Sequence, residues 1–101
     1  MSDASQEPKP PQLQIELDEV VAQGIYANFA IITHSESEFA LDFIFVQPQQ
    51  PKARVRARVI MSPTNTKRLF LALQENIKNY ESRFVPIEIP KEPAAPIGGY
   101  L

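Results

Sequence analysis

Apolar and polar residues alternate strictly from Gln12 to Asp18, with apolar side chains at every second position. This alternation predicts a half-buried β-strand, because successive side chains of a strand point to opposite faces. A second β run follows from Ile25 to Thr33, after Gly24, a residue type that often marks a bend or bulge. The polar residues from His34 to Ser37 predict a short turn.

The next strand is predicted from Glu38 to Val46 and is apolar on both faces, which is typical of a central strand covered on both sides. The segment from Gln47 to Pro51 predicts a protruding hairpin loop, because its prolines lack the N–H that a sheet requires. The last strand is predicted from Lys52 to Met61.

Ser62 and Pro63 predict a helix start, since serine caps helices and proline is tolerated at the first helical position. The helix should end near Arg83. Its apolar residues recur every three or four positions and would cover one face of the sheet. They are Leu69, Phe70, Leu73, Ile77, Tyr80 and Phe84.

The sequence therefore predicts an α+β domain: an antiparallel sheet of three to four strands, followed by one long C-terminal helix packed on one face. We expect residues 12–88 to form this single domain. Residues 1–11 should be a disordered N-terminal tail, because they are polar and rich in proline, and residues 89–101 should be a flexible C-terminal tail, because they contain several prolines and two glycines.

One helix covers only one face of a sheet, so apolar residues on the other face are expected to meet water. Ile32, Ile44 and Val46 are the residues that we assign to this uncovered face. An exposed apolar face usually marks an interface. We therefore expect the face to bind a second copy or another protein, with Ile44 and Val46 among the contacts.

Charge is unevenly distributed along the chain, although its net charge is only -2. Acids dominate before Asp42, and a basic block without any carboxylate follows from Lys52 to Arg68. Within this block Arg54, Arg56 and Arg58 occupy every second position, which predicts three arginines on one face of one strand. Such asymmetry favours an electrostatically guided contact.

Three interpretations of these arginines, together with Lys52, stay open. In the first, the side chains protect an edge strand from aggregation or pair with Asp42 across the sheet. Alternatively they contact an acidic protein. A third interpretation is a nearby or weak nucleic-acid contact, which the acidic net charge and the lack of a known binding motif disfavour.

No pattern in the chain predicts a reaction, a metal or a cofactor. The absence of cysteine excludes disulfides and thiolate metal sites and fits a reducing cytoplasm. His34, beside Ser35 and Ser37, resembles a base and nucleophile, but neighbours within a turn rarely point at each other productively. No apolar run is long enough to span a bilayer, so we expect a cytoplasmic protein without catalytic residues.

Four segments together resemble a family of bacterial proteins of about a hundred residues, catalogued as a domain of unknown function. They are residues 13–35, 37–43, 52–63 and 67–81. The resemblance implies occurrence in Bacteroides-like bacteria and association with RNA polymerase, through genes that neighbour those of the large polymerase subunits. It implies no catalytic residues.

The resulting hypothesis is a non-enzymatic accessory subunit or factor that binds the RNA polymerase core. The alternative is a homo-oligomeric binding module, dimeric and chaperone-like, that pairs through the apolar sheet face. A nucleic-acid binder that uses the basic strand is the third hypothesis.

Overall fold

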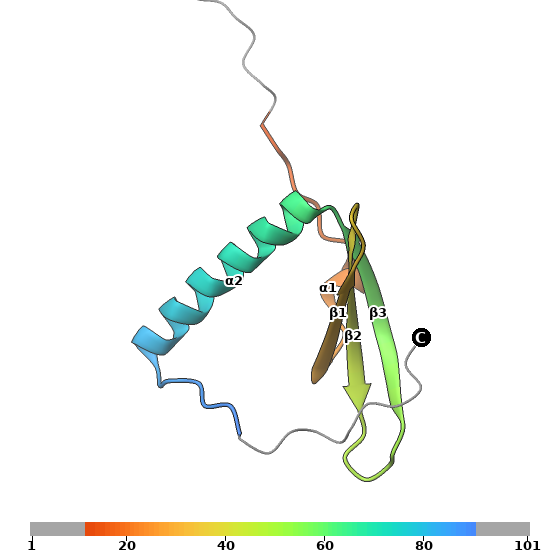
Figure 1. Ribbon diagram of the computed structural model, residues 1–101. Helices are drawn as coiled ribbons and strands as arrows, with labels where there is room; N and C mark the ends of the chain where they lie inside the picture. Colours follow the sequence, from red (N-terminus) through yellow and green to blue (C-terminus); the bar gives the residue numbers. More distant parts are fainter. Residues whose placement is uncertain (1–11, 91–101) are drawn as a thin grey trace, which may run out of the picture.

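The computed structural model describes residues 12–90. A three-stranded antiparallel sheet precedes one long helix (Figure 1), so the predicted α+β class is confirmed. The two predicted tails lie outside the described residues, apart from residues 89 and 90. In chain order the elements are α1 (Glu19–Ala22), β1 (Phe29–His34), β2 (Phe39–Val46), β3 (Ala53–Met61) and α2 (Pro63–Arg83).

The sheet is a meander in which β2 lies between β1 and β3, as its two-sided apolar pattern predicted. A tight turn joins β1 to β2, where the Ser35 N–H donates to the Glu38 carbonyl at 2.9 Å. The buried apolar residues of the described chain are Leu41 and Ile44, both on β2. The core is therefore small and is confined to the central strand.

The strand register overturns the predicted uncovered face. Opposite residues of an antiparallel pair point to the same face. Ile32 pairs with Leu41 on one face, whereas Ile44 pairs with Phe29 on the other. The expectation that Ile32 and Ile44 share a face is therefore wrong, and Ile44 does not meet water, because only 3% of it is exposed.

The predicted strand from Gln12 to Asp18, here called the arm, has no regular secondary structure and joins no strand of the described chain. That prediction is wrong, because alternation creates a strand only where a neighbouring strand accepts its backbone hydrogen bonds. The short helix α1 follows the arm. Gly24 ends it with φ +73, a left-handed conformation that favours glycine, and its N–H donates to the Val21 carbonyl at 3.0 Å.

Two hydrogen bonds of the Asn28 side chain connect the chain to the sheet just before β1. Its Nδ2 donates to the Val46 carbonyl at 2.9 Å, and the Val46 N–H donates to its Oδ1 at 2.8 Å. The side-chain amide thus takes the place of a peptide group beside the end of β2. This pair of bonds fixes where β1 begins, four residues later than Ile25.

Helix α2 begins where the sequence predicted. The Asn65 N–H donates to the Ser62 Oγ at 3.2 Å, and Pro63 occupies the first turn. The helix does not pack on the sheet as expected, since none of its residues is buried and its axis diverges from the strands in Figure 1. Its apolar stripe remains about half exposed, as at Phe70 and Leu73.

Candidate protein-binding surface

The arginines of β3 do not form one stripe, because a β-bulge interrupts the strand. Phe43 pairs with Ala57 and Ile44 pairs with Val55, so Arg56 has no opposite residue. Arg58, opposite Asp42, and Arg54, opposite Phe45, consequently lie on opposite faces of the sheet. The predicted common face is therefore wrong.

Arg58 forms an ion pair within the sheet, which is part of the first of the three interpretations. Its Nε donates to Asp42 Oδ1 at 2.6 Å and its second terminal nitrogen donates to Oδ2 at 2.8 Å. Asp42 has no exposed surface, whereas the Arg58 side chain remains half exposed. This bidentate geometry joins the central strand to the edge strand by side chains as well as by backbone.

The ion pair shifts both titrations. The hydrogen bond from Arg58, helped by its charge, lowers the pKa of Asp42, while burial of the carboxyl opposes the change. The hydrogen bond dominates because it acts directly on the ionised form of the carboxyl and outweighs the cost of removing that form from water. The same bond raises the pKa of Arg58. Both groups therefore stay charged near neutral pH.

The other three cations of the strand lie together at the end of the β2–β3 hairpin. Lys52, Arg54 and Arg56, here called the cationic hairpin end, are exposed. Within residues 12–90 none of them forms an ion pair with a carboxylate. The fold thus separates a structural arginine, Arg58, from three cations that face solvent.

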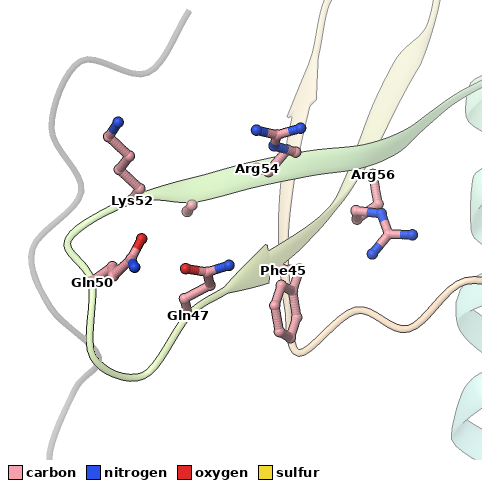
Figure 2. Close-up of a pocket in the computed structure, with 7 residues that line it drawn as sticks. Phe45, Gln47, Gln50, Lys52, Arg54 and Arg56 are labelled. Carbon is pink, nitrogen blue, oxygen red and sulfur yellow. The ribbon is translucent and has the colours of Figure 1, made fainter.

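An open pocket of about 590 Å³ adjoins these cations (Figure 2). Phe45 provides an aromatic wall, and the Tyr26 ring meets it edge-on with 6.1 Å between ring centres. The side-chain amides of Gln47 and Gln50 provide polar groups. Guanidinium and amide groups beside an aromatic ring suit recognition of a carboxylate-bearing protein surface.

The sequence predicted the cations of this pocket but not its other walls. Phe45 belongs to the strand that was predicted to be covered on both sides, and the two glutamines belong to the predicted hairpin loop. A glutamine-rich loop directly before a basic strand was the available signal. The apolar contacts expected at Ile44 and Val46 do not join the pocket, because Ile44 is buried and half-buried Val46 is bound to Asn28.

The serine turn has a structural explanation. Ser35 Oγ accepts the backbone N–H groups of Ser37 and Glu38, each at 3.3 Å, which shapes the turn between β1 and β2. The His34 ring stacks on Phe39, with 5.2 Å between ring centres. Neither contact brings the His34 ring to a serine hydroxyl as a base beside a nucleophile. In the described part of the chain no group of three metal-ligating side chains comes together.

Between residues 12 and 90, no helix has both the length and the hydropathy that a membrane span needs. No curated protein and no solved structure matches the chain. A family model described as "Protein of unknown function (DUF3467)" matches residues 1–89. The chain belongs to this family, as the resemblance in the sequence implied.

Proposed function

We propose that this protein is a non-enzymatic, cytoplasmic interaction protein that binds an acidic surface of a protein partner through the cationic hairpin end. The observation that carries the proposal is the difference between Arg58 and the other cations. Arg58 is paired with Asp42, whereas Lys52, Arg54 and Arg56 have no carboxylate partner in the described chain.

The setting of these cations favours protein recognition. A hairpin loop that protrudes from a sheet can enter a depression of a partner, and arginine binds carboxylates through two parallel hydrogen bonds. The Phe45 ring supplies apolar area beside the charges. Arginine and aromatic residues are the residue types in which interface energy concentrates.

RNA polymerase core is the first partner to test, because the family resemblance implies an association with transcription. The cationic hairpin end would then contact acidic residues of a polymerase subunit. Charge of one sign on a protruding loop also accelerates encounter with an acidic partner, so association should slow as salt rises.

The test is capture of partners from the native host with the tagged full chain at moderate salt, with the captured proteins identified by mass spectrometry. Arg54→Glu combined with Arg56→Glu should weaken capture of the polymerase core at least about 30-fold, which corresponds to about 2 kcal/mol. Lys67→Glu combined with Arg68→Glu changes the net charge equally at the start of α2 and should preserve capture.

Failure to recover polymerase subunits with the unmodified chain would contradict the polymerase assignment. Equal loss in the two double variants would show a general charge effect and contradict the assignment of the hairpin end. Capture that disappears after nuclease treatment and falls steeply with salt would favour the nucleic-acid hypothesis instead.

A further inference from the structure

The described chain leaves an unusually large apolar surface uncovered. Twenty large apolar residues between Leu13 and Ile89 are at least 41% exposed, while only Leu41 and Ile44 are buried apolar residues. Burial of apolar area is the main term that offsets the loss of chain entropy on folding. So small a core buries little of the apolar surface of the sheet and helix, which favours cover by a partner.

Strand β1 forms one open edge of the sheet, since β2 is its only neighbouring strand in the described chain. It reads Phe-Ala-Ile-Ile-Thr-His and contains no proline and no lysine, arginine, aspartate or glutamate. Its register with β2 contains no bulge. Proteins protect lone edge strands with charges, prolines or bulges, and β1 has none of these devices.

We infer that β1 pairs antiparallel with β1 of a second copy of this chain, so that two sheets join into one six-stranded sheet across a two-fold axis. An antiparallel pair of identical strands places like side chains close together, which charged residues would oppose. Strand β1 has no lysine, arginine, aspartate or glutamate. Strand β3 is less suited to such a pair, because its arginines would face the arginines of the second copy.

The exposed apolar residues in and just before β1 favour a permanent homodimer. Ile25, Tyr26 and Ile32 are at least 50% exposed, and the interfaces of obligate homodimers are richer in apolar area than the rest of a protein surface. A transient partner would leave this area in water for part of the time, whereas a second copy is always available.

Single-cysteine variants test the pairing, because the full chain has no native cysteine. Ile32→Cys lies on β1 and Ile60→Cys lies on β3, and the two isoleucines are similarly exposed, at 57% and 51%. A short bis-maleimide cross-linker should convert most of the Ile32→Cys protein to a covalent dimer. It should leave Ile60→Cys at least about tenfold less cross-linked, because the outer edges lie several strands apart.

Light scattering of the unmodified chain provides a measurement that does not depend on a variant. The expected mass is twice the 11.4 kDa of one chain. A folded species of 11.4 kDa at micromolar concentration would overturn the proposal, as would equal cross-linking of the two cysteine variants. A dimer that cross-links through Ile60→Cys alone would also overturn it, because that result moves the interface to β3.

Discussion

The two edges of the sheet differ in every feature that controls strand pairing. Strand β3 has three arginines, a bulge at Arg56 and an ion pair to Asp42, whereas β1 has no such charge and no bulge. Charges and bulges prevent a strand from adding to an edge. This difference is the basis of the two proposals above, in which β3 would present charge to a partner and β1 would be closed by its own copy.

The largest expected effect comes from placing a charge on the uncharged edge. Ile32→Glu puts two like charges close to the proposed two-fold axis and should raise the dimer dissociation constant by about 100-fold or more. Ile60→Glu introduces the same charge on β3 and should leave the dimer intact. Sedimentation over a concentration series distinguishes the two variants, and a stable Ile32→Glu dimer would remove the distinction between the edges.

The next effect concerns the ion pair that holds β3 to the sheet. Asp42→Asn keeps the shape of the side chain but loses the charge that Arg58 recognises through two hydrogen bonds. We expect a lower melting temperature with the dimer preserved, measured by circular dichroism and light scattering. Arg58→Lys keeps the charge but loses the bidentate geometry. Its melting temperature should therefore lie between those of the unmodified chain and Asp42→Asn.

The pH dependence of stability provides an independent test of the same pair. The pKa of Asp42 is lower in the folded chain than in the unfolded chain. Its contribution is therefore complete above the unfolded value of about 3.9 and is lost as pH falls through the folded value. The difference in melting temperature between the unmodified chain and Asp42→Asn should shrink below about pH 4. A difference that is constant from neutral to strongly acidic pH would contradict the assignment.

The smallest effect concerns the start of β1. Asn28→Ala removes both hydrogen bonds to Val46. Because these bonds are exposed to solvent, we expect a loss of only about 1 kcal/mol in the free energy of unfolding, measured with urea. Asn28→Asp keeps the acceptor and loses the donor, so it should fall between Asn28→Ala and the unmodified chain. A fully stable Asn28→Ala would mean that backbone pairing alone defines the edge.

Local patterns predicted the elements of the fold that depend on neighbours in sequence. The helix start at Ser62 and Pro63 and the central position of β2 follow from capping chemistry and from two-sided hydrophobicity. The polar turn before Phe39 is likewise confirmed by its hydrogen bonds. These features are decided within a few residues, so a single sequence contains enough information to predict them.

Predictions failed where a feature depends on contacts between distant segments. The arm alternates like a strand, but its own chain provides no neighbour for it. The bulge at Arg56 depends on the register between β2 and β3, and no single strand reveals it. For this reason the basic block was recognised as a candidate site, while the division between Arg58 and the other cations required the structure.

The meander order of the strands also has a kinetic consequence. Each strand pairs only with the next one along the chain, through connections of a few residues. Closing such short loops costs little entropy, so sheets with local contacts fold rapidly. During synthesis the residues of all three strands leave the ribosome before those of α2. The nascent chain would thus form its hairpins first and the long helix α2, with its exposed apolar stripe, last.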